Sequence, residues 1–141
     1  MENPVIIVER TFKASTSVVW KALTDKDEMK KWYFDLKEFK AEKGFVFQFV
    51  SGPPNETQYT HICEITEVVP EKKLIYSWRY EGYEGISFVT FELRALGNET
   101  IVTLTHKGIE SFPKHPHFAP GNFKDGWNHI INTSLKEHLE S

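Results

Sequence analysis

The chain has 141 residues, which fits a single domain over residues 1–141, and its 17 basic and 20 acidic side chains leave a net charge of −3. A charge so near neutral gives no reason to expect nucleic acid or an anionic membrane surface as a partner. The single cysteine, Cys63, excludes an internal disulfide framework, and the apolar run 5–8 is too short for a signal peptide or a membrane span. We therefore expect a cytoplasmic protein that neither binds nucleic acid nor inserts into membranes.

A strand and two short helices are predicted for the N-terminal part of the chain. Residues 5–13 (VIIVERTFK) contain the β-branched residues that favour a strand. The hydroxyl side chains that follow can cap a helix over residues 18–24. Asp25, with Glu28 three residues later, is a capping-box pattern for a second helix, which we expect to end near Trp32.

Six further strands are predicted in the middle of the chain. They cover residues 36–41, 45–50, 61–69, 73–80, 86–94 and 100–106. Glycine, proline and asparagine separate these runs as they do in turns, and Gly97–Asn98 is a hairpin signal. Because no two strands after residue 44 leave room for a crossover helix, we expect a mostly antiparallel sheet.

One long helix is predicted over residues 121–139. Asn122 can cap its first turn, and Asp125 adds a negative charge where the helix dipole favours one. Its apolar side chains recur at helical spacing and form one stripe: Phe123, Trp127, Ile130, Ile131, Leu135 and Leu139. Since most of the preceding chain is predicted as strand, the stripe predicts a helix laid across a curved antiparallel sheet, an α+β architecture.

Gly126 stands inside this predicted helix. A glycine in a helix interior costs about 1 kcal/mol relative to alanine, so we interpret it as making room for close packing beside Trp127. On that interpretation, Gly126→Leu is expected to disturb the protein far more than Asn128→Leu.

Five segments of the chain resemble one protein superfamily. They are ALTDKDEMKKWYF (22–34), EITEVVPEKKLIYSW (64–78), SFVTFEL (87–93), ETIVTLTHKG (99–108) and the GW pair at 126–127. In this order, over residues 5–140, they are similar to the SRPBCC (START-like) superfamily, which includes polyketide cyclase/dehydrase and Bet v-type relatives. They are most similar to its branch of activator of heat-shock-protein-90 ATPase homologue-like proteins.

The resemblance implies a helix-grip fold, in which a curved seven-stranded antiparallel sheet grips the C-terminal helix and leaves a cavity between them. It implies that Trp127 is the family's helix tryptophan, that Trp32 closes the second short helix and that Trp78 lies on a cavity-facing strand. The chain departs from the branch at Cys63, where relatives commonly have glycine, and over residues 50–59, where no family motif is found. The branch name also implies a stress response and a chaperone partner. We do not expect that partner, because the co-chaperone that named the branch has a separate N-terminal domain that this sequence does not supply.

An aromatic-rich set of side chains is the candidate ligand site. In the implied fold the cavity-lining residues are Trp32, Tyr76, Trp78, Tyr80, Val89, Phe91, Leu104, His106, Trp127, Ile131 and Leu135. Rings and hydroxyls of this kind can stack on and orient a ligand, or they can fill a core. We assign no catalytic residue and expect no cofactor.

His106 is the candidate acid or base of the site, because it shares a strand face with Val102 and Leu104. The alternative is a strand-end histidine bonded to a backbone carbonyl. The sequence places no carboxylate close to it except Glu110, four residues on.

The histidines are the candidate ligands of a metal site. His115 and His117 form an H-x-H pair, and the other histidines available are His61, His129 and His138. The chain has neither CxxC nor HExxH, so we expect exposed loop histidines and no metal. Cys63 lies among apolar residues of a predicted strand, which indicates a buried thiol.

Three functions follow as hypotheses. The first is a non-catalytic domain that holds a small hydrophobic or amphipathic molecule between the long helix and the sheet. The second is a protein-interaction or co-chaperone-like domain whose exposed apolar patch contains Ile86, Phe88 and Phe118. An outward Phe88 could also form a homodimer face, so monomer and homodimer both stay open. The third is a cyclase- or hydrolase-type enzyme that uses a cavity histidine or tyrosine.

Overall fold

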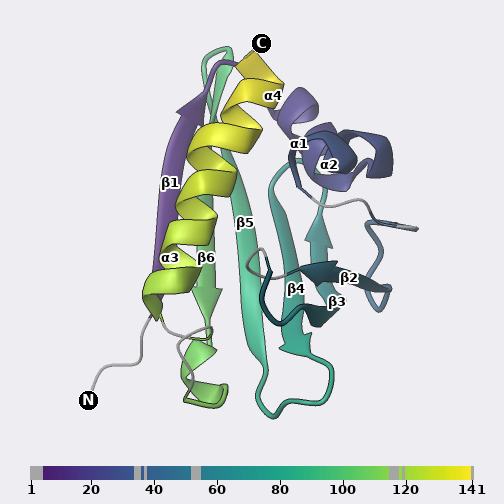
Figure 1. Ribbon diagram of the computed structural model, residues 1–141. Coiled ribbons are helices and arrows are strands. Elements are labelled where there is room, and N and C mark those ends of the chain that lie inside the picture. The colour runs from purple at the N-terminus through teal and green to yellow at the C-terminus, as the bar shows by residue number, and fades with distance from the viewer. Residues whose placement is uncertain are drawn as a thin grey trace.

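The C-terminal helix lies across one face of an antiparallel sheet (Figure 1). The structure is a computed structural model and describes residues 5–33, 36, 38–51, 55–114, 118 and 120–140. Within these residues the sheet has six strands in the order β1-β6-β5-β4-β3-β2, and every neighbouring pair is antiparallel. The strands are β1 (Ile6–Phe12), β2 (Val46–Ser51), β3 (Tyr59–Val69), β4 (Lys73–Tyr80), β5 (Ser87–Leu96) and β6 (Glu99–Lys107). The predicted α+β class and antiparallel sheet are confirmed.

The predicted strand over residues 36–41 is not among the described strands, so the expected seven strands are six. Residues 36 and 38–41 lie outside the sheet, and residue 37 lies outside the described residues. Side-chain packing positions this segment, because the Phe39 ring meets the rings of Phe45 and Phe47 edge-on, with centroids 6.2 and 5.2 Å away. In the described sheet β2 is therefore an edge strand that pairs with β3 alone.

Two short helices follow β1, as predicted: α1 (Thr16–Thr24) and α2 (Lys26–Trp32). The side chains of Ser15 and Asp25 cap them by accepting hydrogen bonds from backbone N–H groups of the first turn. The Glu28 carboxylate, expected in a capping box, pairs with His138 (2.8 Å) and so joins α2 to the C-terminal helix.

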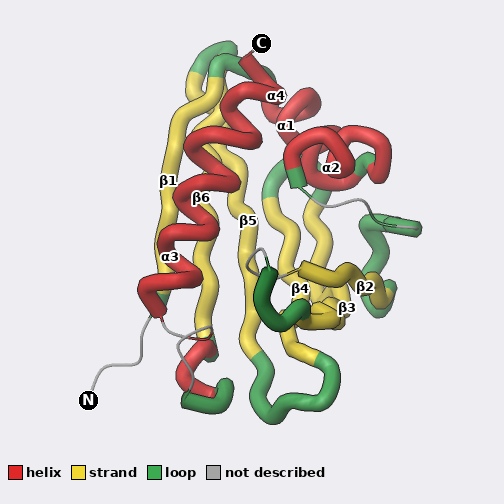
Figure 2. The backbone as a smooth tube through the Cα atoms, viewed as in Figure 1, coloured by secondary structure: helices red, strands yellow, loops and turns green. Residues whose placement is uncertain are grey.

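The C-terminal helix is continuous (Figure 2) and consists of three consecutive segments. They are α3 (Pro120–His129), η3 (Ile130–Leu135) and α4 (Lys136–Glu140), and the short helix η1 (Ile109–Ser111) precedes them. The middle segment η3 is a π-helix, in which hydrogen bonds span five residues rather than four. The predicted apolar stripe faces the sheet, with four members buried and Ile130 and Leu139 partly buried. The predicted helix is confirmed, although a 3.6-residue period does not reveal the π-turn.

Gly126 does not serve close packing. It is exposed, and a side chain at this position would meet nothing within 4 Å. Asn128 is half-buried, and its amide oxygen accepts a hydrogen bond from Asn132 (3.2 Å). The packing interpretation of Gly126 is therefore wrong, and the expected order of the two leucine substitutions is reversed.

The core fills the space between the sheet and the helices. Along β6 burial alternates, with Thr100, Val102, Leu104 and His106 buried on the face toward the helix. α1 and α2 lie beside the C-terminal end of the long helix (Figure 1). Among the described residues, no helix is both long enough and apolar enough to cross a membrane.

Candidate functional site

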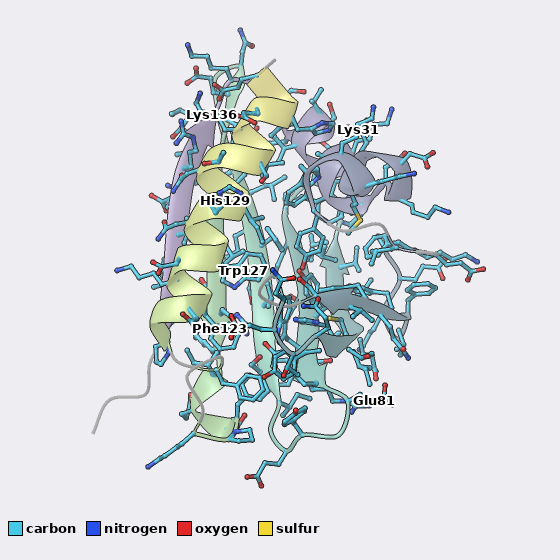
Figure 3. The ribbon with its side chains drawn as sticks, in the orientation of Figure 1. Lys31, Glu81, Phe123, Trp127, His129 and Lys136 are labelled. Atoms are coloured by element: carbon cyan, nitrogen blue, oxygen red, sulfur yellow. The ribbon has the colours of Figure 1, made fainter. Side chains whose placement is uncertain are left out.

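The side chains between the long helix and the sheet form one layer rich in rings. Trp127 and Phe123 project from the helix toward the strands (Figure 3). All eleven predicted site residues are buried: Trp32, Tyr76, Trp78, Tyr80, Val89, Phe91, Leu104, His106, Trp127, Ile131 and Leu135. The structure places them in the packed core, and their lining of a cavity stays a prediction.

Trp127 is at the centre of this layer. Its ring centroid lies 5.6 Å from that of Trp78, 6.1 Å from that of Phe91 and 6.0 Å from the His106 imidazole. Tyr76 joins the group through Phe91, at 6.2 Å. These spacings are those of aromatic rings in contact. Contacts between rings therefore join the helix to β4, β5 and β6.

Two predicted site residues lie at opposite ends of the layer. The Trp32 indole donates to the Ala22 carbonyl oxygen (2.8 Å), which joins α2 to α1. The Tyr80 ring packs on Phe112 and Phe118 near η1, with centroids 5.1 and 4.8 Å away. The predicted set thus extends along the core. The members that the structure brings together are Trp127, Trp78, Phe91, His106 and Tyr76.

His106 belongs to a chain of hydrogen bonds that crosses from the helix to the sheet. The Trp127 indole N–H donates to His106 Nδ1 (2.9 Å), and His106 Nε2 lies 2.7 Å from the Ser87 hydroxyl oxygen. The Ser87 hydroxyl donates to the Trp78 carbonyl oxygen (3.1 Å). Since an indole N–H can only donate, His106 Nδ1 carries the lone pair and Nε2 carries the proton. Every polar hydrogen in this chain of hydrogen bonds then has an acceptor.

The protonation of His106 follows from its surroundings. Its side chain is completely buried, and the loss of water around the imidazolium lowers its pKa to about 3. The alternative of a histidine bonded to a backbone carbonyl is wrong, and the role of His106 as an acid or base stays a prediction. Its bonds go to Trp127 and Ser87, and Glu110 is exposed on η1.

Ser87 is a site residue that the sequence prediction missed. It could have been found from the β5–β6 hairpin, because Val89 faces His106 across the two strands and residue 87 lies two positions away on the same face. The sequence prediction selected large aromatic side chains, and a serine does not meet that criterion.

A pair of tyrosine hydroxyls is the second polar contact in the layer. The hydroxyl oxygens of Tyr33 and Tyr76 lie 2.7 Å apart. Burial raises the pKa of both phenols well above its usual value, so both stay protonated. The half-buried Tyr33 ring follows α2 and lies nearly parallel to the Trp127 ring, with 6.3 Å between centroids and 17° between planes. The sequence prediction did not include Tyr33, although it adjoins Trp32.

Two further buried groups are also uncharged. His61 stacks on Phe49, with centroids 4.5 Å apart, and burial lowers its pKa to about 4. Burial raises the pKa of the Cys63 thiol, and the predicted buried cysteine is confirmed. The layer therefore combines rings with neutral hydrogen-bonding groups.

Of the remaining histidines, the structure describes His129 and His138, which lie apart from each other. His129 is exposed on α3, His138 pairs with Glu28, and the His115–His117 pair lies outside the described residues. In the part of the chain that the structure describes, no group of three or more His, Cys, Asp or Glu side chains is placed to hold a metal.

Comparison with known proteins identifies relatives of this fold. The family model described as Activator of Hsp90 ATPase homolog 1-like protein matches residues 13–140. No curated protein sequence matches the chain significantly. A solved structure of the Rhizobium loti protein Mll3558 superposes with a TM-score of 0.84 at 20% identity, over 98% of each chain. The solution structure of the Bacillus halodurans protein BH1534 gives 0.75 at 25% identity, over 99% of each chain.

A third relative is longer than this chain. DynU16, from the dynemicin biosynthetic locus, superposes with a TM-score of 0.81 at 21% identity, over 99% of this chain and 48% of its own. The chain thus spans about half the length of DynU16. Together with the structures above, this similarity confirms an α+β fold with a long C-terminal helix on an antiparallel sheet, which fits the expected helix-grip architecture.

Proposed function

The chain belongs to the family of Activator of Hsp90 ATPase homolog 1-like proteins, and from that premise we propose that it is a non-catalytic domain that binds a small hydrophobic or amphipathic molecule between the C-terminal helix and the sheet. The observation that carries the proposal is the Tyr33–Tyr76 hydroxyl pair beside Trp127. The pair places two hydrogen-bonding groups among aromatic rings. Pockets that bind small molecules are likewise lined by apolar and aromatic side chains with a few polar groups.

The chemistry of the layer favours a ligand whose buried part is uncharged. The polar groups that meet there are phenol, indole, imidazole and serine hydroxyl, all neutral at physiological pH. Burying an ion beside them without an opposite charge would be costly. A phenol, a ketone or an alcohol can exchange hydrogen bonds with the tyrosine hydroxyls at little cost.

Tyr33 is the proposed point of access. It is half-buried, whereas Tyr76, Trp78 and Trp127 are buried, and it directly follows α2. A side chain at a helix end can rotate without breaking the helix, so displacement of the Tyr33 ring opens the face of Trp127. The ligand then takes the place of that ring against the indole.

A ligand screen tests the proposal. Thermal-shift and native mass-spectrometry measurements against lipids, sterols and aromatic polyketides are expected to find compounds that raise the melting temperature and add their mass. A hydrogen-bonding ligand replaces Tyr33 as the partner of the Tyr76 hydroxyl, so Tyr76→Phe should weaken binding roughly tenfold, the value of one good hydrogen bond. Tyr83→Phe, at an exposed tyrosine outside the layer, is the matched control. A screen in which no compound binds contradicts the proposal.

A protein-interaction role is the second candidate, supported by exposed apolar side chains on β1 and at the start of β5. Ile7, Ile86 and Phe88 are 61, 43 and 42% exposed. Phe118, expected in this patch, is buried against Tyr80 and is removed from it. Light scattering would detect a homodimer, and a pull-down with the ninety-kilodalton heat-shock chaperone tests the partner implied by the family name.

The enzyme hypothesis loses its main candidate residue. Both His106 nitrogens are engaged inside the core, where their hydrogen bonds go to the Trp127 indole and the Ser87 hydroxyl and not to a carboxylate or a tyrosine hydroxyl. A general acid or base must reach the proton that it transfers. The geometry of His106 therefore favours binding over catalysis.

A further inference from the structure

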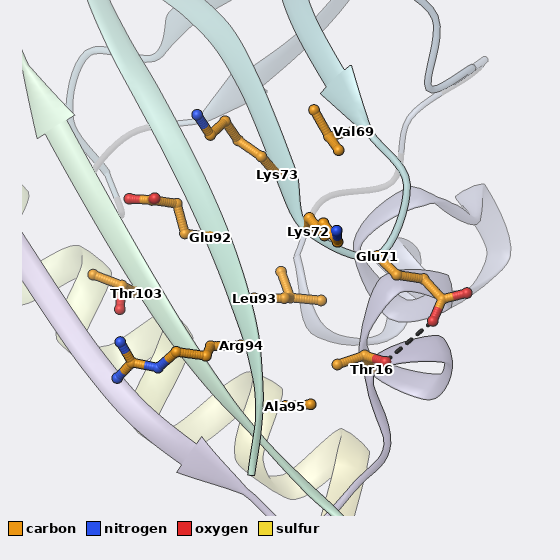
Figure 4. A pocket seen from close by; sticks show the side chains of 10 residues that line it. All are labelled: Thr16, Val69, Glu71, Lys72, Lys73, Glu92, Leu93, Arg94, Ala95 and Thr103. Carbon is orange, nitrogen blue, oxygen red and sulfur yellow. Dashed lines mark hydrogen bonds between the residues drawn. The ribbon is translucent and has the colours of Figure 1, made fainter.

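A concave surface lies outside the helix–sheet layer, an open groove of about 760 Å³ beside the turn between β3 and β4 (Figure 4). Lys73 pairs with Glu67 (3.4 Å), and the other charged side chains of the groove are two cations and two anions. These are Lys72, Arg94, Glu71 and Glu92. Because the two signs balance, the groove favours neither an anion nor a cation. A charged side chain without a counterion among the described residues lies elsewhere, on the helix side of β1.

Arg10 is this side chain. It takes an inward-facing position on β1 between Val8 and Phe12, which are buried, and it is itself half-buried. Its guanidinium carbon lies 6.0 Å from the centre of the Phe12 ring. No carboxylate in the part of the chain that the structure describes forms an ion pair with it. Because a charge is costly to withdraw from water without an opposite charge, this guanidinium favours an anion as its partner.

A short chain of hydrogen bonds fixes which groups beside Arg10 are donors. Arg10 Nη1 donates to Asn132 Oδ1 in η3 (3.3 Å), and Asn132 Nδ2 donates to Asn128 Oδ1 in α3 (3.2 Å). Because a guanidinium can only donate, Asn132 has to turn its oxygen toward Arg10 and its NH₂ toward Asn128. Both amide oxygens are thereby engaged. The groups of these three residues that lack a partner within the described structure are N–H donors: Arg10 Nε, Arg10 Nη2 and Asn128 Nδ2.

The free donors of Arg10 lie on one edge of its guanidinium. Nε is the only buried side-chain nitrogen or oxygen among the described residues that has no hydrogen-bond partner. Nη2, which also lacks a partner there, is not buried and so is open to solvent. Nη2 is the terminal nitrogen on the edge that carries the Nε hydrogen. The two N–H groups therefore form a planar fork of the kind that receives both oxygens of a carboxylate.

We propose that Arg10 anchors a binding site for the carboxylate group of a small organic acid, at the seam between β1 and the C-terminal helix. One carboxylate oxygen accepts from Nη2, which faces solvent, and a small rotation of the side chain brings Nε to the other oxygen. The Asn132 amide holds Nη1 meanwhile. A carboxylate fits better than a phosphate, because the fork is planar and the bonded groups of the seam carry one positive charge.

This carboxylate site is separate from the ligand layer proposed above. β1 lies on one side of the C-terminal helix, and α2, which Tyr33 follows, lies on the other (Figure 1). The inference therefore goes beyond the proposed function and does not depend on it.

NMR titration of the intact, nitrogen-15-labelled chain with sodium acetate tests the proposal, with sodium chloride holding the ionic strength constant. We expect the Arg10 Nε–H and the Asn132 side-chain amide resonances to shift saturably, with a dissociation constant in the millimolar range. Acetamide, the uncharged isostere, should shift neither resonance. Inorganic phosphate should bind more weakly than acetate, and tighter binding of phosphate would overturn the assignment to a carboxylate.

Variants of Arg10 separate its charge from its fork, with the Asn132 amide as the reporter. Arg10→Gln should abolish the acetate-dependent shift, and Arg10→Lys, which keeps the charge without the fork, should weaken binding roughly tenfold. Both variants should fold, because Arg10 makes one long hydrogen bond within the described structure. Lys107→Gln, which removes an exposed charge from the other face of β6, is the matched control and should bind acetate unchanged.

Two results would overturn the proposal. One is acetate that shifts neither resonance, and the other is acetate that binds Arg10→Gln as tightly as the unaltered chain. Arg10 would then be an inward-pointing charge that protects the edge strand β1 from pairing with other chains. Tyr76→Phe should leave acetate binding unchanged, so the carboxylate site and the ligand layer are tested separately.

Discussion

Ser87 is the smallest member of the hydrogen-bond chain and touches both of its neighbours. Ser87→Ala leaves the buried His106 Nε2–H without its acceptor and removes one hydrogen bond from the Trp78 carbonyl oxygen. We expect a loss of about 1 to 3 kcal/mol in the free energy of unfolding, the cost of unsatisfied buried groups. Urea denaturation measures it. Thr90→Ala, half-buried on the other face of β5, should change stability by less than about 0.5 kcal/mol. Equal effects of the two substitutions would show that the hydrogen-bond chain contributes nothing to the free energy of unfolding.

The two buried imidazoles make stability depend on pH. The pKa of His106 is lowered to about 3 and that of His61 to about 4, against about 6.5 for an unfolded histidine. Between pH 6.5 and 4 the unfolded chain binds protons at these positions that the folded chain does not, so stability falls as the pH falls. Each histidine contributes a slope of up to about 1.4 kcal/mol per pH unit. Urea denaturation from pH 7 to pH 5 checks this above the range in which most carboxylates titrate. The rise in stability is complete above the unfolded pKa, and a flat profile would contradict the buried neutral state.

Gly126 is the clearest test at the scale of one helix. Because it is exposed with open space around it, Gly126→Ala should stabilise the protein by up to about 1 kcal/mol, as the helix gains propensity and the unfolded chain loses freedom. Gly85→Ala is the contrasting variant. Gly85 has a φ of 101°, and a Cβ there would collide with the Ser111 carbonyl oxygen, so that substitution should destabilise. Thermal melting of both variants tests whether residue 126 faces solvent. A lower melting temperature for Gly126→Ala would contradict that orientation of the helix.

Element types were predictable wherever one periodicity governs a segment. The stripe on the long helix and the alternation along β4, β5 and β6 each follow from a single face being buried. The segment over residues 36–41 has a strand-like composition, but aromatic packing by Phe39 decides its path. The π-helix over Ile130–Leu135 was not predicted, because a single period of 3.6 residues was assumed for the whole helix.

At the scale of the molecule, burial of the candidate site was predictable and its bonding was not. Alternation alone indicates that Trp78 and His106 face inward. Which groups meet there depends on contacts between residues 19 and 43 positions apart, as in the Ser87–His106 and Tyr33–Tyr76 pairs. Those contacts need the register of two hairpins and the position of the end of α2. A single sequence constrains the register of the hairpins weakly, and it constrains the position of the end of α2 hardly at all.

Cys63 can report on the opening of the whole core, because it is the only cysteine in the chain. Its thiol is completely buried on the inner face of β3, and burial raises its pKa, so the reactive thiolate forms only when the core opens. We expect a disulfide reagent to label the folded protein at least about a hundredfold more slowly than the urea-denatured chain. Trp127→Phe removes the indole donor to His106 and should speed labelling roughly tenfold, whereas Ser17→Ala, exposed on α1, should leave the rate unchanged. A ligand bound beneath the helix should slow labelling by mass action. Equal rates in folded and denatured protein would mean that the layer around Trp127 does not shield the thiol, and the close packing of helix on sheet would then be wrong.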